Sequence, residues 1–394
     1  MVTKGRQSGR REKRLRMKLI HLSDLHLGKR VNEYSMIEDQ AYILKEIIKI
    51  IKDEAPDGVI IAGDVYDKSV PSAEAVQLFD EFLTRLGEME LAVFVISGNH
   101  DSPERMAFGS RLMSASGIHI APVYCGEIEP VTLRDEHGEV RVYMLPFVKP
   151  THVRSVLGVE AVTYTDAMRH AVEAMHVDTA ARNVLVTHQF VTGATRSESE
   201  EISVGGTDNV DVSVFDAFDY VALGHIHSPQ SCTRESVRYS GTPLKYSFSE
   251  ARDHKSVSVV ELGAKGEVSV RTVPLVPLHD MVEIRGKYEE LMLRSYYEGT
   301  SYTHDYMHVT LTDEEDIVDA IGRLRTVYRN LMKLDYDNRR TAAVSQIDGA
   351  EEVERKSPYD HFAELYELQN NAPMSDEQTA LIRELIEQVW EEER

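Results

Sequence analysis

Between Lys18 and about Leu275, short apolar runs alternate with amphipathic segments, and the two patterns predict different elements. Continuous runs such as "GVIIAGD" and "LAVFVISGNHD" are typical of strands buried on both faces. Residues 38–52 instead carry apolar side chains at helical spacing, which predicts an amphipathic helix. Strands that alternate with helices favour an α/β domain. Shorter alternating strands from about Val237 onwards predict a mixed sheet or a second sheet.

Two further helices have predictable starts. Ser72 is a candidate N-cap for a helix that runs to Leu86. Ser102 is followed by Pro103, whose ring suits the first helical position, so a second helix is expected to run from Ser102 to Met113.

The pattern changes at the prolines Pro274 and Pro277, where we place a domain boundary. Residues 18–275 form the predicted α/β domain, and residues 276–340 read as strand, helix and strand, which predicts a small α+β unit. Before the first domain, residues 1–17 form a basic segment.

A polar linker is expected over residues 341–357, followed by two helices within 358–394. Ser375 and Gln378 have the spacing of a capping box at the start of the second helix. That helix carries an apolar stripe made of Leu381, Ile382, Leu385, Ile386, Val389 and Trp390. Such a stripe usually packs on its own domain. Because it follows a linker and contains the only tryptophan, it also fits a helix that enters a partner's groove.

Composition restricts the cellular setting. Of the 394 residues, 42% are hydrophobic, which is ample for a folded core. The cysteines Cys125 and Cys232 have no disulfide or zinc-site spacing, which fits a reducing compartment. The longest apolar run is far shorter than the ~20 residues of a membrane span. We therefore expect a cytoplasmic protein without a membrane segment.

Charge is distributed unevenly. Residues 1–17 carry seven Lys or Arg and one Glu, and they lack the apolar core of a signal peptide. This segment is expected to be a disordered tail, or to precede a natural start at Met17. The net charge is −22, so the residues after this tail carry −28. So acidic a chain does not coat DNA, and any contact with nucleic acid must be local, for example at Lys29 and Arg30, or shared with a partner.

Five predicted strands end in loops rich in Asp, Asn and His. The side chains concerned are Asp24, His26, Asp64, Asn99, His188, His225 and His227. Sites in open α/β sheets form at the carboxyl ends of strands, so these loops are expected to converge. Seven oxygen and nitrogen donors, one of them shared, suit two divalent ions about 3.5–4 Å apart. This mixture of donors favours Mn²⁺ or Fe²⁺, and it also accommodates zinc.

Single residues of these loops also have a plain structural interpretation when each is taken alone. Asp64 follows a glycine and fits a turn, Asp101 or Ser102 fits a helix cap, and His188 fits a hydrogen-bonded core histidine. The coincidence of five such strand ends favours a metal site over these separate interpretations.

The order D-x-H, G-D, G-N-H-D, H and G-H-x-H resembles the calcineurin-like metallophosphoesterases, which bind two metal ions. Within them, "HLSDLHLGK" and "YSGTPLKYSFSEARDHKSV" look like the SbcD family of bacterial nuclease subunits. The resemblance implies a four-layer αββα sandwich. It also implies that the small α+β unit is a capping domain and that the terminal helices bind the coiled coil of an SbcC-type, SMC-like ATPase.

The resemblance also implies roles for single residues. One metal would be held by Asp24, His26, Asp64 and His227, and the other by Asp64, Asn99, His188 and His225, with Asp64 as the bridge. His100 would be the catalytic histidine, and Asp101 would orient its ring. The chain departs from some archaeal and eukaryotic relatives, which have a histidine three residues after the bridging aspartate, because Asp67 stands there.

The implied activity is a Mn²⁺-dependent 3′→5′ exonuclease on duplex DNA ends and an endonuclease on single strands and hairpins. Such an enzyme would act in DNA repair, recombination and replication as a homodimer within a heterotetramer, near the nucleoid. Two alternatives remain: a phosphatase or phosphodiesterase for another substrate, and a scaffold that has lost its activity. A scaffold that has lost its activity is expected to lack some of the metal ligands, whereas all seven candidate ligands are present.

Overall fold

A computed structural model describes most of the chain as two compact units. The described residues are 16–195, 197, 208–338, 362, 374–375, 378–379 and 381–382. The first unit contains residues up to 284 with 292–309 and 321–334, and the second contains 285–291, 310–320 and residues from 335 onwards. The linker at 341–357, residues 1–15 of the basic tail and most of the terminal helices lie outside the described residues, so these predicted boundaries stay predictions.

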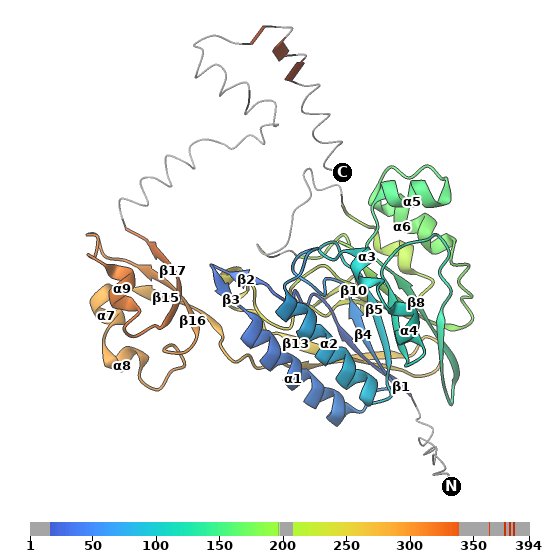
Figure 1. Ribbon diagram of the computed structural model, residues 1–394, viewed down its shortest axis with the longest axis horizontal. Helices are drawn as coiled ribbons and strands as arrows, with labels where there is room; N and C mark the ends of the chain where they lie inside the picture. Colours follow the sequence, from blue (N-terminus) through green and yellow to red (C-terminus); the bar gives the residue numbers. More distant parts are fainter. Residues whose placement is uncertain are drawn as a thin grey trace. The chain divides into compact units, whose positions relative to one another are not determined.

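Two six-stranded sheets make up the centre of the first unit (Figure 1). The first sheet contains, in spatial order, β14 (Val268–Pro274), β13 (Ser256–Leu262), β1 (Met17–Leu22), β4 (Gly58–Ala62), β5 (Ala92–Ile96) and β6 (Ile118–Ala121). Its strands β1, β4, β5 and β6 are parallel, whereas β13 and β14 run antiparallel to their neighbours. The predicted mixed sheet is confirmed.

The second sheet has the same mixed character. It contains, in spatial order, β11 (Gln230–Cys232), β12 (Arg234–Tyr239), β10 (Tyr220–Gly224), β9 (Arg182–His188), β8 (Gly138–Leu145) and β7 (Val131–Asp135). Strands β12, β10, β9 and β8 are parallel, and the outer strands β11 and β7 are antiparallel to them.

Alternation along each strand separates three hydrophobic layers. In β4, Val59 and Ile61 belong to one cluster, whereas Ile60 and Ala62 belong to the cluster between the sheets. Successive side chains point to opposite faces of a strand, so a strand covered on both faces must be apolar throughout. This explains why "GVIIA" is a continuous apolar run, and it confirms two buried sheets within an α/β fold.

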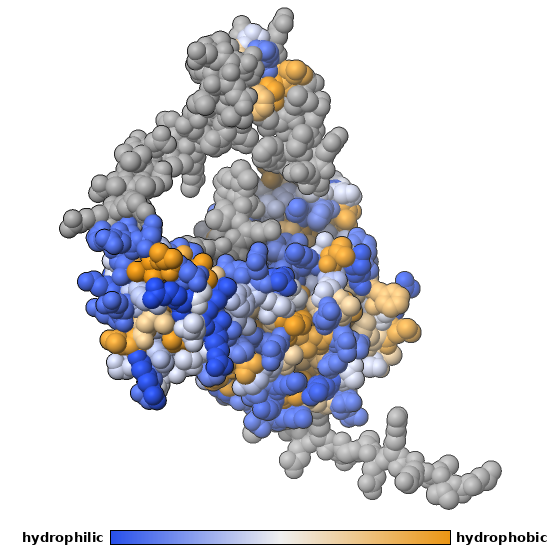
Figure 2. All heavy atoms as spheres, turned by 60° about the vertical axis from the view of Figure 1, so that its left-hand side comes forward, coloured by the Kyte–Doolittle hydropathy of each residue, from blue (hydrophilic) through white to orange (hydrophobic). Residues whose placement is uncertain are grey.

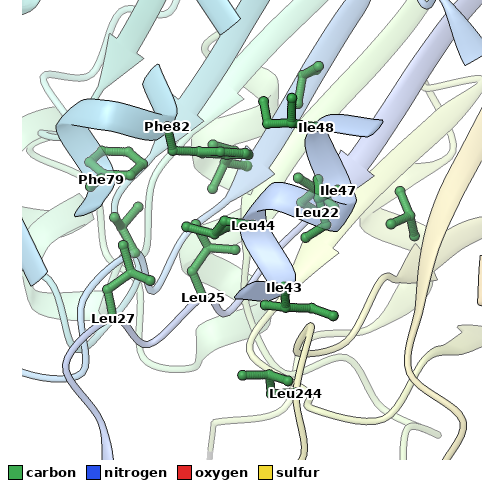
Figure 3. Packing of buried hydrophobic residues seen from close by; sticks show 14 of the residues in the cluster. Leu22, Leu25, Leu27, Ile43, Leu44, Ile47, Ile48, Phe79, Phe82 and Leu244 are labelled. Atoms are coloured by element: carbon green, nitrogen blue, oxygen red, sulfur yellow. The ribbon is translucent and has the colours of Figure 1, made fainter. Parts of the chain in front are cut away.

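Helices cover the outer face of each sheet. Helices α1 (Ile37–Glu54) and α2 (Ala73–Glu88) pack on the first sheet and on each other, and Figure 3 shows Leu44 and Phe82 from these helices beside Leu22 and Leu25. Helices α5 (Pro150–Leu157) and α6 (Tyr164–Glu173) cover the second sheet. The result is the expected order of helix, sheet, sheet and helix.

The predicted helix starts are correct, but one predicted helix is divided. Ser72 caps α2 by accepting a hydrogen bond from the Ala75 amide, and Ser102 caps α3 (Pro103–Met106). The expected continuous helix to Met113 is wrong. Gly109 has a φ of 75°, which ends the helical path, and α4 (Ser110–Ser114) follows it.

After the prolines, the expected strand, helix and strand are present. A three-stranded sheet has the order β15 (Met281–Gly286), β16 (Tyr306–Leu311) and β17 (Asn330–Tyr336). The short helices of this region are α7 (Tyr288–Leu291), α8 (Arg294–Tyr297) and α9 (Ala320–Leu324). The capping box is confirmed further on, where Ser375 and Gln378 exchange hydrogen bonds of 2.9 and 3.2 Å between side chains and amides.

The remaining elements are short. They are β2 (Arg30–Val31), β3 (Tyr34–Ser35) and the 3₁₀ helices η1 (Val212–Phe215) and η2 (Phe248–Glu250). In the described part of the chain, no helix is long and apolar enough to cross a membrane. The face shown in Figure 2 is largely hydrophilic, with hydrophobic side chains gathered in smaller areas.

Candidate metal centre

The carboxyl ends of five parallel strands meet at one edge of the two sheets. Beyond β1 and β4 the loops continue side by side, because the amides of Asp24 and His26 donate to the carbonyls of Gly63 and Asp64 at 3.0 Å each. The second sheet reaches the same place, where His188 Nδ1 lies 2.9 Å from the carbonyl oxygen of Ala62. The predicted convergence of the strand-end loops is therefore present.

Three of the predicted ligands form a first group. Donor atoms of Asp24, His26 and His227 lie within 4.8 Å of one another, and all three residues are buried. The Nε2 atoms of His26 and His227 are 3.2 Å apart. Two imidazole nitrogens and a carboxylate oxygen at this spacing could share one divalent ion.

The second group forms around Asn99. Its Oδ1 atom lies 3.0 Å from His188 Nε2 and 3.0 Å from His225 Nδ1. Asp64 completes this group, since its Oδ2 atom is 3.2 Å from His188 Nε2. The amide oxygen of Asn99, two imidazoles and a carboxylate give a mixed donor set of the kind expected from the sequence.

Asp64 stands between the two groups. Its Oδ2 atom is 3.8 Å from His26 Nε2 as well as close to His188. Burial opposes ionisation of Asp64, but the adjacent histidines outweigh it and hold the pKa of this carboxyl well below its usual range. In return, the Asp64 charge outweighs burial at His188 and raises its pKa to about 9. An ionised carboxylate between the two groups could serve an ion in each of them.

Burial affects the first group differently. It lowers the pKa of His26 well below the usual range, and the charges of His227 and Lys29 add to this effect. Burial also raises the pKa of Asp24. A neutral imidazole is the form that binds a metal, so His26 is held in its ligand form. The Asp24 carboxylate accepts hydrogen bonds from the His225 amide at 3.0 and 3.2 Å, which links the two groups.

The backbone approaches this site closely at two glycines. A Cβ atom on Gly98 would lie 2.1 Å from Asp64 Oδ1, and one on Gly224 would lie 1.9 Å from the Ala62 carbonyl oxygen. No real Cβ atom is tolerated at such distances, so only glycine fits these positions. The glycines that precede the sequence motifs therefore make room for the ligand loops.

His100 lies beside the candidate ligands. Its amide donates to Asp64 Oδ1 at 2.9 Å, and a donor atom of its side chain lies within 4.8 Å of those of His26 and Asp64. Its Nδ1 atom is 3.0 Å from the carbonyl oxygen of Asp67. Because a carbonyl only accepts hydrogen bonds, Nδ1 carries the proton, and Nε2 is the atom left for a substrate.

Asp101 has a different role from the one expected. Its carboxylate accepts hydrogen bonds from the amides of Val65, Tyr66 and Gly98 at 3.1, 2.9 and 2.9 Å. It thus ties the loop after β4 to the loop after β5, while the Asp67 carbonyl orients the His100 ring. Sequence motifs cannot predict that the Asp67 carbonyl contacts His100, because every residue has a backbone carbonyl.

Two polar residues behind the first group were missed. Gln40 Nε2 donates to the His26 carbonyl at 2.8 Å and to the Tyr246 hydroxyl at 2.9 Å. Tyr246 in turn donates to the Leu25 carbonyl at 2.7 Å. A glutamine that is buried among the apolar residues of α1 was the available signal, since a buried polar group requires partners.

Comparisons with known proteins agree with this geometry. A family model described as calcineurin-like phosphoesterase matches residues 17–229, and one described as type 5 capsule protein repressor C-terminal domain matches residues 277–370. The expectation of a metal-dependent phosphoesterase is thereby confirmed.

Two curated relatives are named as the SbcD component of the nuclease SbcCD. The protein of Staphylococcus saprophyticus is 35% identical over 323 residues, which cover 81% of this chain and 84% of the relative. The protein of Staphylococcus epidermidis is 33% identical over 323 residues, with 81% and 85% covered. Identity at this level over most of both lengths, together with the phosphoesterase match, shows that the chain belongs to the SbcD family of calcineurin-like metallophosphoesterases.

Proposed function

We propose that the chain is the nuclease component of an SbcCD-type complex. It hydrolyses phosphodiester bonds of DNA, as a 3′→5′ exonuclease on duplex ends and an endonuclease on single strands and hairpins, in DNA repair, recombination and replication. The observation that carries this proposal is the convergence of seven oxygen and nitrogen donors from five strand ends on two adjacent groups. The names of the two relatives support a nuclease within such a complex.

The ligand assignment is part of the proposal. Asp24, His26, Asp64 and His227 would hold one ion, and Asp64, Asn99, His188 and His225 would hold the other. The donor set fits Mn²⁺, because it mixes carboxylate, amide and imidazole groups without a thiolate. When bound, two divalent ions neutralise the phosphate charge and make a water molecule more acidic for attack on phosphorus.

The chain's own residues position the remaining chemistry. Asp67 fixes the His100 ring through its carbonyl, so that Nε2 is available to the leaving 3′ oxygen. Asp101 holds the loop that carries both Asn99 and His100. His100 is therefore the proposed catalytic residue, and Asp101 is a positioning residue.

The proposed partners are an SbcC-type ATPase and a second copy of this chain. Phe108 and Leu112, at the turn into α4 and within it, are 87% and 81% exposed. Large exposed apolar side chains so close together support a protein interface at α3 and α4.

Sedimentation of Phe108→Glu tests this: we expect a monomer where the parent chain is a dimer, and an unchanged dimer would exclude this interface.

We infer that local basic residues near the site contribute little to DNA binding. Lys29 Nζ is 2.7 Å from Asp67 Oδ1, so part of its charge is neutralised within the chain. We therefore assign most of the positive field that holds DNA to the ATPase partner, and we place the complex in the cytoplasm at the nucleoid.

Hydrolysis of duplex DNA and of p-nitrophenyl phosphate, each with Mn²⁺, tests the substrate. We expect DNA hydrolysis to exceed that of the small ester, and to increase when SbcC and ATP are added. Efficient turnover of p-nitrophenyl phosphate with no DNA hydrolysis under either condition would instead indicate a phosphatase.

A further inference from the structure

A buried ion pair lies directly behind His227. The side chains of Glu250 and Lys255 are 0% and 4% exposed, and Lys255 Nζ is 2.6 Å from Glu250 Oε2. Glu250 comes from η2, and Lys255 immediately precedes β13. Removing two charges from water is costly, so a pair this deeply buried requires further compensation.

Both members of the pair contact His227. Glu250 Oε1 is 3.6 Å from His227 Nδ1, and Lys255 Nζ donates to the His227 carbonyl oxygen at 2.9 Å. The carboxylate thus faces one ring nitrogen, while the ammonium holds the backbone of the same residue. The other ring nitrogen, Nε2, is the atom that lies 3.2 Å from His26 Nε2 in the first group.

This arrangement favours one tautomer of His227. A carboxylate favours a proton on the nitrogen that it faces, here Nδ1, and so leaves the Nε2 lone pair for a metal. His188 in the second group is held differently, since its Nδ1 atom faces the Ala62 carbonyl oxygen. The ion pair therefore contacts the first group of candidate ligands, through His227.

The backbone around His227 fits tightly as well. The Thr242 amide donates to the His227 carbonyl oxygen at 3.0 Å, and a Cβ atom on Gly241 would lie 2.5 Å from that oxygen. The same carbonyl thus accepts from both Thr242 and Lys255. One segment of the chain, residues 241–255, therefore supplies several of the contacts that fix the position of His227.

We propose that Glu250 and Lys255 are a positioning pair that sets the affinity of the Asp24, His26 and His227 site, and that leaves the Asn99, His188 and His225 site unchanged. This inference rests on the proposed two-metal function. It adds two residues that no motif of the metal ligands contains. They act through His227, so substituting them is expected to change the Mn²⁺ affinity directly and the rate of DNA hydrolysis only as a consequence.

The test is the number and affinity of Mn²⁺ ions per chain in the full-length protein, measured by equilibrium dialysis. For Glu250→Gln, we expect one ion to bind as in the parent and the other to bind about 10–100-fold more weakly, the usual effect of removing a carboxylate behind a histidine ligand. Glu250→Asp is expected to restore part of that affinity.

A matched control separates positioning from general stability. Asp135 and Arg182 form another buried pair in the same unit, with both side chains 4% exposed. Asp135→Asn is expected to lower the unfolding temperature and to leave both Mn²⁺ affinities unchanged. If Glu250→Gln does not fold, Glu250→Gln/Lys255→Met, which leaves no lone buried charge, is measured in its place.

The outcomes distinguish this inference from the proposed function. Two unchanged Mn²⁺ affinities in the Glu250 variant would overturn the positioning pair, and so would an equal loss of both ions or a loss matched by Asp135→Asn. The proposed function would still stand if the parent chain binds two Mn²⁺ ions and cuts DNA. A parent chain that binds no Mn²⁺ would instead contradict the metal centre itself.

Discussion

Several of the proposed metal ligands have backbone conformations that side chains disfavour. Asp24, His26 and Asp64 have φ angles of 52°, 43° and 47°, and His225 has a φ of 105°. Such conformations cost about 1–3 kcal/mol each and persist only where the surroundings enforce them. Asp and His are among the side chains that adopt this region more readily than most, and four such residues lie in the strand-end loops of the candidate site.

His100 is the residue whose substitution best separates chemistry from metal binding. We predict that His100→Ala keeps both metal ions and lowers DNA turnover by about 10²–10⁴-fold, the usual contribution of a general acid or base. Metal analysis and single-turnover hydrolysis of duplex DNA measure the two effects. Unchanged turnover would remove His100 from the mechanism.

At the scale of elements, loops of the first sheet are held together by hydrogen bonds to their backbones, in addition to the candidate ligands that they carry. The loop after β1 bonds to the loop after β4, and Asp101 bonds that loop to the one after β5. The β7–β8 hairpin has its own anchor, because Arg182 at the start of β9 bonds to Asp135 at 2.5 and 2.9 Å.

The ion pair between Asp135 and Arg182 predicts a pH dependence of stability. Burial opposes ionisation of Asp135, but Arg182 outweighs it and lowers the pKa of Asp135 below its usual value of about 4. The pair's contribution is therefore present above pH 4 and is lost as the pH falls through the lowered pKa.

For Asp135→Asn we expect a loss of about 3–5 kcal/mol at pH 7, because Arg182 keeps an unpaired buried charge. The difference from the parent chain is expected to shrink below pH 4. Urea unfolding at pH 7 and at about pH 2.5 measures it, and a difference that stays constant between these two values would contradict the role of the ion pair.

The sequence predicts most of the site, because its donors stand at fixed places in the motifs. Five strand ends and the side chains that follow them can be recognised from apolar runs and i, i+2 spacing. The Asp67 carbonyl could not be predicted, since any residue supplies one. Glu250 and Lys255 lie within the quoted stretch "YSFSEARDHKSV", but only the fold shows that they reach His227. The division of α3 from α4 depends on the conformation of Gly109, which sequence spacing does not report.

At the scale of the whole molecule, a net charge of −22 must be reconciled with DNA as the proposed substrate, which is a polyanion. An enzyme with this charge gains little from long-range attraction to DNA, so a partner has to supply it. We expect DNA binding by the isolated chain to be weak and DNA binding by the complex to be strong.

We propose, on the sequence pattern alone, that residues 358–394 bind the ATPase partner. We predict that a chain truncated after Lys356 keeps its Mn²⁺ content and its unfolding temperature but no longer co-purifies with SbcC. Pull-down with the full-length chain is the control. Co-purification of the truncated chain in equal amount would show that the partner binds elsewhere.

The central claim, two ions bridged by Asp64 at a DNA-cutting site, is tested most directly by measuring Mn²⁺ content and duplex DNA hydrolysis in Asp64→Asn beside the parent chain. We predict two Mn²⁺ ions per chain and hydrolysis in the parent, and loss of most bound Mn²⁺ and most hydrolysis in the variant, because the bridge serves both ions. A variant that keeps both ions and cuts DNA at the parent rate would contradict the account.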